Sequence, residues 1–102
     1  MDVSSRKDGD TLFVKVSGAV DTEGAEILKN KLNDALREKP SKVVMDLTMV
    51  PMMGSSGIGK ILLFYKSLGA MNAKFEIKGI QDNLFSIFKA VKLDKLFPIS
   101  LK

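Results

Sequence analysis

The sequence predicts an α/β domain built on a mixed, mostly parallel β-sheet of about five strands, with helices packed on it. Segments with strand-like patterns alternate along the chain with segments of helical periodicity, in the order β-β-α-β-α-β-α-β. Two strands separated by a helix are predicted to be parallel, because the helix carries the chain back across the sheet. With 102 residues, of which 45% are hydrophobic, the chain matches one domain over residues 1–102 with a single core.

The first two strands are predicted to form an antiparallel hairpin. Residues 11–18, TLFVKVSG, alternate apolar and polar side chains and end on a glycine, which is typical of a half-buried strand. Asp8, Gly9 and Asp10 before this strand are turn-forming residues, and residues 3–6 supply a short partner strand. This hairpin is the antiparallel part of the predicted sheet.

The first helix is predicted to begin at Asp21 or Thr22 and to end before Pro40. Asp and Thr both suit the cap of a helix, Glu23 suits the positive end of the helix dipole, and proline cannot continue the helix. The apolar side chains of this segment fall on one face, which consists of Ala25, Leu28, Leu32, Ala35 and Leu36.

A buried strand is predicted at residues 42–47 and a second helix at residues 55–68, with Gly69 as the residue that ends the helix. The connection at residues 48–54 is expected at the carboxyl edge of the sheet, where open sheets of this kind carry functional groups. Tyr65 and Phe64 are interpreted as packing residues. The predicted apolar face of the helix consists of Ile58, Ile61, Leu62, Tyr65 and Leu68.

The last part of the chain predicts a strand at residues 73–79, a helix at residues 81–91 and a short strand at residues 96–100. Pro98 lacks an N–H group, which indicates an edge position for the last strand. The expected apolar face of the helix consists of Leu84, Ile87, Phe88 and Val91.

The composition excludes several classes of function. The chain contains no Cys and no His, so a disulfide framework, a zinc site and a histidine-based hydrolase are not expected, and neither is any other metal or cofactor. The net charge is +4, but the basic residues are scattered among acidic ones, and we expect no nucleic-acid partner. No apolar segment reaches the length of a membrane span, so a cytoplasmic protein without a membrane partner is expected.

Residues 54–60, GSSGIGK, match the G-x-x-x-x-G-K pattern of a phosphate-binding loop. The residue after Lys60 is Ile61, where that motif places a Ser or Thr to hold magnesium. Asp46 is the nearest candidate for the second magnesium anchor, but it lies in the strand that feeds the loop. We therefore expect no nucleotide hydrolysis here, and weak nucleotide binding is the least favoured interpretation.

The same residues have a structural interpretation. In it, Gly54 forms a turn, Ser55 caps the second helix, and Gly57 and Gly59 permit close packing. Two glycines in the first turns of a helix cost about 1 kcal/mol each relative to alanine, so a close neighbour or a binding partner is expected beside them. Met49, Met52 and Met53 lie in or beside the preceding loop. They either cover the core or form an adaptable protein-binding surface.

Three segments together resemble the STAS domain of bacterial anti-sigma factor antagonists. The central segment is VVMDLTMVPMMGSSGIGKILLFYKSLGA, residues 43–70, which follows the family pattern of an apolar strand, Asp-Leu, a short loop, Asp-Ser-Ser-Gly and a helix. VSGAVDTEGAEIL, residues 16–28, resembles the turn into the first helix of the family. LFSIFKAVKLDKLFPIS, residues 84–100, resembles its last helix and strand. The resemblance spans nearly the whole chain and implies the same strand order.

The resemblance implies a non-enzymatic partner switch. Antagonists of this family, when unphosphorylated, bind an anti-sigma factor with serine kinase activity and thereby free a sigma factor. The kinase then phosphorylates a serine, which by motif position is Ser55, with Ser56 as the runner-up, and a serine phosphatase resets the protein. The expected partner-binding residues are Asp21, Thr22, Met52, Met53, Gly54, Ser55, Ser56, Gly57 and Lys60.

Two residues depart from the family pattern. Gly54 stands where the family places Asp, which leaves Ser55 as the expected helix cap and removes an acidic group beside the phosphorylated residue. Lys92 stands where the family often has Gly, so a strained left-handed backbone is expected there. Because of Gly54, a second interpretation stays open, in which the chain is a scaffold or regulatory subunit of another signalling or transport complex, without a phosphorylation switch.

Overall fold

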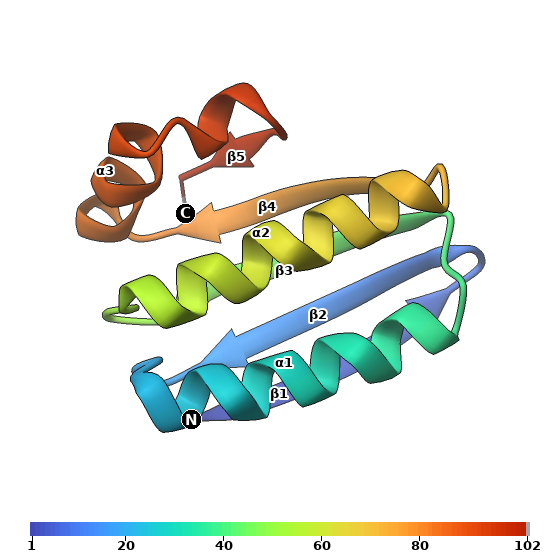
Figure 1. Ribbon diagram of the computed structural model, residues 1–102, viewed down its shortest axis with the longest axis horizontal. Helices are drawn as coiled ribbons and strands as arrows, with labels where there is room; N and C mark the ends of the chain where they lie inside the picture. Colours follow the sequence, from blue (N-terminus) through green and yellow to red (C-terminus); the bar gives the residue numbers. More distant parts are fainter. Residues whose placement is uncertain (102) are drawn as a thin grey trace.

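The computed structural model describes residues 1–101 and shows a five-stranded sheet with helices in front of it (Figure 1). The strands are β1 (Asp2–Asp8), β2 (Thr11–Ser17), β3 (Lys42–Met49), β4 (Lys74–Ile80) and β5 (Ile99–Ser100). The helices are α1 (Thr22–Arg37), α2 (Ser55–Ala70) and α3 (Asp82–Ala90), followed by a short 3₁₀ turn, η1 (Leu93–Lys95). This order confirms the α/β class and the predicted succession of elements.

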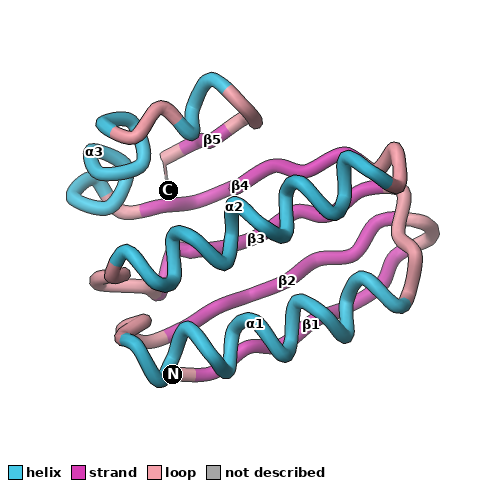
Figure 2. The backbone as a smooth tube through the Cα atoms, in the orientation of Figure 1, coloured by secondary structure: helices cyan, strands magenta, loops and turns pink. Residues whose placement is uncertain are grey.

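The strands lie in the sheet in the same order as in the chain. β1 is antiparallel to β2, and every other neighbouring pair is parallel, as predicted. Crossovers between parallel strands are right-handed. Because the strands also follow one another in a single direction across the sheet, α1 and α2 lie on the same face of it (Figure 1). Figure 2 shows that α1, α2 and α3 also begin at the same edge of the sheet.

The core lies between the sheet and these helices. Leu12, Val14 and Val16 of β2 are buried while the residues between them are more exposed, which confirms the predicted half-buried strand. The predicted face of α1 is buried except for Leu36, which is partly buried. Phe64 packs edge-on against Phe75 with ring centroids 5.7 Å apart, and Tyr65 contacts Phe97 at 5.2 Å. Both aromatic residues of α2 are therefore packing residues, as predicted.

Two helix predictions were wrong in detail. α2 continues through Gly69 to Ala70, and the left-handed residue after it is Asn72, with φ of 59°. Asn tolerates this conformation better than other side chains that carry a Cβ, so no glycine is needed. On the predicted face of the third helix, Leu84 is buried as predicted, but Ile87 and the C-cap residue Val91 are exposed. The reason is that α3 lies beyond the long strands (Figure 1), where a narrow stripe suffices to cover the core.

The final strand is shorter than predicted: only Ile99 and Ser100 pair as β5, and Phe97 before them is buried in the core. The Pro98 carbonyl accepts a hydrogen bond from Ile77 N at 2.9 Å. β5 pairs only with β4, which confirms the edge position. None of the helices within residues 1–101 combines the length and the apolar character that a bilayer crossing requires.

Lys92 has a left-handed backbone with φ of 64°, as expected from its place in the sequence. A residue with a Cβ pays roughly 1–2 kcal/mol there, and glycine does not. Part of the gain is lost because glycine is more flexible in the unfolded chain. We therefore expect Lys92→Gly to raise the free energy of unfolding by about 0.5–1 kcal/mol, measured by urea denaturation. The control Lys89→Gly, inside α3, should lower it by a similar amount, and a loss of stability in Lys92→Gly would contradict the strain.

Candidate partner-binding site

The loops that precede α1 and α2 are joined at one edge of the sheet, on the left in Figure 1. Val20 N donates to the Met52 carbonyl at 3.0 Å, and Gly54 N donates to the Val20 carbonyl at 3.0 Å. Val20 and Met53 thereby form an isolated parallel bridge, and Gly18 N donates to the Met49 carbonyl at 2.9 Å. These bonds extend the pairing of β2 and β3 beyond the strand ends, so the loop backbone is fixed before any partner binds.

The connection between β4 and α3 supports the same loop from its other side. Gln81 Nε2 donates to the Thr48 carbonyl at 2.9 Å, and Asn83 Nδ2 donates to the Pro51 carbonyl at 3.0 Å. The sequence reasoning missed both side chains. The signal was present, because the carboxyl ends of neighbouring parallel strands meet at one edge, and amide side chains directly after residues 73–79 were candidates for that edge.

The α2 N-terminus leaves both serines accessible. The cap is Gly54, with an extended backbone and no side-chain hydrogen bond, and Ser55 is the first helical residue. The prediction that Ser55 caps the helix was therefore wrong, because the Gly54 carbonyl already accepts from Gly57 N at 3.1 Å and from Ile58 N at 3.2 Å. Ser55 and Ser56 are exposed. Within residues 1–101, no hydrogen bond occupies either hydroxyl.

Met53 and Gly57 form a buried contact under the loop. Met53 is only 4% exposed, so it covers the core, which is one of the two interpretations given for the three methionines, and it is not on the surface as the expected partner-binding set assumed. A Cβ on Gly57 would lie 2.7 Å from Met53 Cγ and 2.8 Å from Val20 Cγ1. Gly57 is thus needed for close packing, as predicted. A Cβ on Gly59 would meet no atom within 4 Å, so the same prediction was wrong for Gly59.

The exposed surface around the loop carries apolar side chains as well as hydroxyl groups. Met49 and Met52 are 55% and 51% exposed, although such flexible apolar side chains are usually covered in a monomer. Asp21 and Thr22, at the start of α1, are also exposed. Asp21 is the cap of α1, where its Oδ1 accepts from Gly24 N at 2.7 Å. We call the exposed set Asp21, Thr22, Met49, Met52, Ser55 and Ser56 the loop surface.

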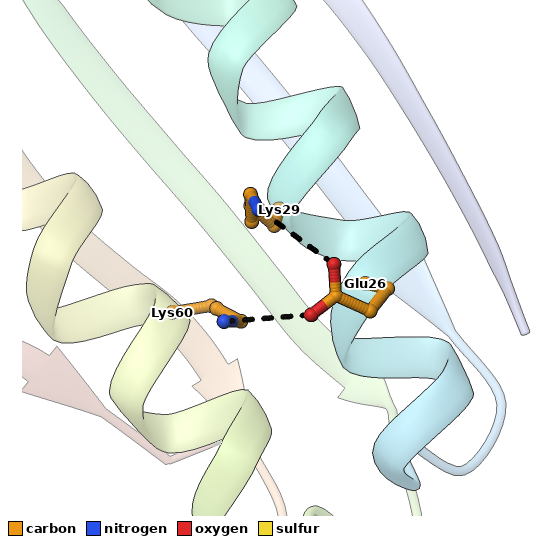
Figure 3. Close-up of polar contacts among 3 residues, drawn as sticks. All are labelled: Glu26, Lys29 and Lys60. Atoms are coloured by element: carbon orange, nitrogen blue, oxygen red, sulfur yellow. Dashed lines mark ion pairs between the residues drawn. The ribbon is translucent and has the colours of Figure 1, made fainter.

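Lys60 is directed toward α1. Its Nζ lies 3.6 Å from Glu26 Oε1, and Lys29 contacts the other oxygen of the same carboxylate at 3.7 Å (Figure 3). The Lys60 side chain is 24% exposed. Residues 55–60 are already helical, so the GSSGIGK segment has no open loop whose N–H groups can wrap a phosphate chain. This geometry speaks against the nucleotide-binding interpretation.

Gly54 accepts a side chain without strain. Its φ of −80° is ordinary for any residue, and a Cβ there would meet only the Val20 carbonyl oxygen, at 3.9 Å. An Asp at this position is placed to accept from the free N–H groups of the first turn. Gly54→Asp is therefore expected to raise the free energy of unfolding by a few tenths of a kcal/mol, to about 1 kcal/mol at most. The measurement is urea denaturation with Gly54→Asn as the uncharged control, and a destabilised Gly54→Asp would contradict the observed cap.

Comparison with known proteins agrees with this fold. The family model of the STAS domain matches residues 2–102. The anti-sigma-B factor antagonist of Listeria monocytogenes is 28% identical over 93 residues, which cover 91% of this chain and 82% of that protein. A crystal structure of an anti-sigma factor antagonist from Mycobacterium paratuberculosis superposes with a TM-score of 0.89 at 24% identity, covering 99% of this chain and 86% of the other. Phosphorylated SpoIIAA of Bacillus superposes with a TM-score of 0.77 at 16% identity, and the match covers 99% of this chain and 93% of the other. The chain therefore belongs to the STAS domain family.

Proposed function

We propose that this chain is an anti-sigma factor antagonist that, when unphosphorylated, binds an anti-sigma factor with serine kinase activity and so releases a sigma factor. Family membership and the curated antagonist from Listeria support the proposal. One observation carries it: two accessible serines begin α2 beside the exposed Met49 and Met52, on loops whose backbone is already fixed. The chain would be the ligand and the substrate of the kinase, and not itself a catalyst.

Phosphorylation at the start of α2 would change the loop surface without unfolding the domain. A phosphate adds a charge of about −1.5 to −2 at neutral pH. The N–H groups of Ser55 and Ser56 have no helical partner, and together with the helix dipole they favour an anion at this position. Against a partner, however, the same charge must lose its water beside Met52, which costs several kcal/mol. The modification therefore opposes binding and leaves folding intact.

Ser55 is the proposed site of phosphorylation, with Ser56 as the runner-up, and a serine phosphatase would restore the binding form. Ser55 matches the position of the first serine in the family pattern and lies next to Gly54 at the tip of the helix. Ser56 has a different advantage, because Lys60 follows it by one helical turn. Lys60 is already paired with Glu26, so a phosphate on Ser56 would compete with that carboxylate.

The proposal is tested with the anti-sigma kinase encoded by the same organism. Incubation of the purified chain with this kinase and ATP should add one phosphate, which peptide mass mapping should place on Ser55. Ser55→Ala should abolish the phosphate, whereas Ser86→Ala, an exposed serine on α3, should not. Absence of phosphate from both Ser55 and Ser56 would refute the switch.

A role as scaffold or regulatory subunit of another complex is the second candidate. The observation that favours it is Gly54, which offers no carboxylate beside the serines. The two roles are separated by affinity capture from a lysate of the source organism followed by mass spectrometry. Recovery of a transporter or a large signalling complex, together with unmodified serines in the recovered chain, would favour the second role. Recovery of a kinase of the anti-sigma type favours the first.

A further inference from the structure

The uncovered face of the sheet carries a concavity that lies away from the loop surface. The helices occupy the opposite face (Figure 1). The concavity has a volume of about 460 Å³ and is lined by residues of β1, β2, β3 and β4. Such a volume falls within the range of small-molecule sites, which is about 300–1,000 Å³.

The floor of this concavity is apolar. Phe13 and Val44 are direct neighbours in the parallel register of β2 and β3. Both lie in the concavity, and Val44 is only 8% exposed although no helix covers it. The Arg6 guanidinium lies over the Phe13 ring, 4.5 Å from the ring centre, so it covers one face of this ring from the β1 side. A flat apolar group would therefore find an aromatic and an aliphatic surface in one place.

The walls of the concavity are mainly cationic. Lys15 and Lys78 line it together with Arg6, and Asp46 is the one acidic residue in the lining. Asp46 is already engaged, since its Oδ1 accepts from Thr48 N at 2.8 Å. Among residues 1–101, no ion pair involves Arg6, Lys15 or Lys78. By contrast, Lys42 of β3 pairs with Glu76 of β4 at 2.9 Å. The lining therefore carries three cationic groups against the one Asp46 carboxylate, which is the register neighbour of Lys15, so its net charge is positive.

We propose that this concavity binds a small amphipathic organic anion, with a flat apolar body on Phe13 and Val44 and its anionic group held by Lys15 and Lys78, which outweigh the Asp46 carboxylate. The volume of the concavity matches a small molecule, and the positive net charge of its lining favours an anion. The bound anion would lie on the face opposite α1 and α2, so it would leave the loop surface free for the partner. This inference does not rest on the proposed function.

The test uses 8-anilinonaphthalene-1-sulfonate, a fluorescent aromatic anion, with the full folded chain. Its emission should rise to saturation with one site per chain. Lys15→Glu and Lys78→Glu should each weaken binding by roughly tenfold, because each puts a like charge beside the sulfonate. The matched controls Lys31→Glu and Lys66→Glu, exposed on α1 and α2, make the same change in net charge and should bind the probe like the original chain. Circular dichroism of each variant verifies that the fold is retained.

Two further measurements identify the chemistry that the site recognises. N-phenyl-1-naphthylamine, the neutral relative of the probe, should bind at least about tenfold more weakly if the anionic group is recognised. A short oligothymidylate should fail to compete with the probe if the site is a bounded pocket. The proposal is overturned by unsaturable emission, by equal effects of the control variants, by equal binding of the neutral probe, or by full competition from the oligonucleotide.

Discussion

Ser55→Asp is expected to weaken binding to the anti-sigma partner by about a hundredfold or more, which corresponds to roughly 3 kcal/mol. Ser55 is exposed at the first position of α2, so the new carboxylate is solvated in the free protein and favoured by the helix dipole. In the complex it would be removed from water beside Met52, and the cost of that desolvation appears as lost affinity. Titration calorimetry of the purified chain with its anti-sigma factor measures the change.

The matched control is Ser41→Asp. Ser41 is also exposed, but it lies between α1 and β3, at the opposite end of the sheet, so it carries the same added charge away from the loop surface. Its affinity should stay within about threefold of the original, as expected for a charge outside the interface. If Ser55→Asp kept full affinity and Ser56→Asp lost it, the switch would be assigned to Ser56. If both kept full affinity, charge at this site would not control binding.

Gly79→Ala is expected to lower the free energy of unfolding by about 2–4 kcal/mol, a large part of the 5–15 kcal/mol typical of a domain. Gly79 has φ of +89°, where a residue with a Cβ is strained by roughly 1–2 kcal/mol. A Cβ there would also overlap Thr48 Oγ1 and lie 3.2 Å from Asp46 Oδ1, which adds a packing cost of about 1–3 kcal/mol. The expected fall in melting temperature is at least about 10 °C.

Two variants separate the causes of this loss. Gly59→Ala adds the same methyl group in open space within α2, and it should raise stability by about 1 kcal/mol through helix propensity. Adding Thr48→Ala to Gly79→Ala removes the overlapping hydroxyl. The double variant should therefore recover the steric part of the loss and retain the part due to the positive φ. A Gly79→Ala variant as stable as the original chain would contradict the geometry of β4 at this position.

The local structure around the candidate site was predicted more accurately than the contacts within it. Asp21 as the α1 cap and the loop before α2 followed from local rules, because a cap and a strand-helix junction depend on residues close in sequence. Ser55 was wrongly expected as a cap, since the pairing of the Gly54 and Val20 backbones places the helix start one residue earlier. For Met53 the local sequence left burial and exposure open. Its neighbours Val20 and Gly57 come from two loops, and their contact exists only after β2 and β3 pair.

The sequence by itself determined the order of the elements, the class of the sheet and the segment that carries the two serines. Alternation of apolar residues in β2 and helical spacing in α1 are local patterns, and the hydrophobic effect translates them directly into buried faces. Only the tertiary structure decided which of three neighbouring methionines lies inside, that Lys60 pairs with Glu26, and that Gln81 and Asn83 hold the loop. These outcomes depend on contacts between segments separated by about thirty residues. Such contacts are fixed by strand register and helix placement, which no local pattern contains.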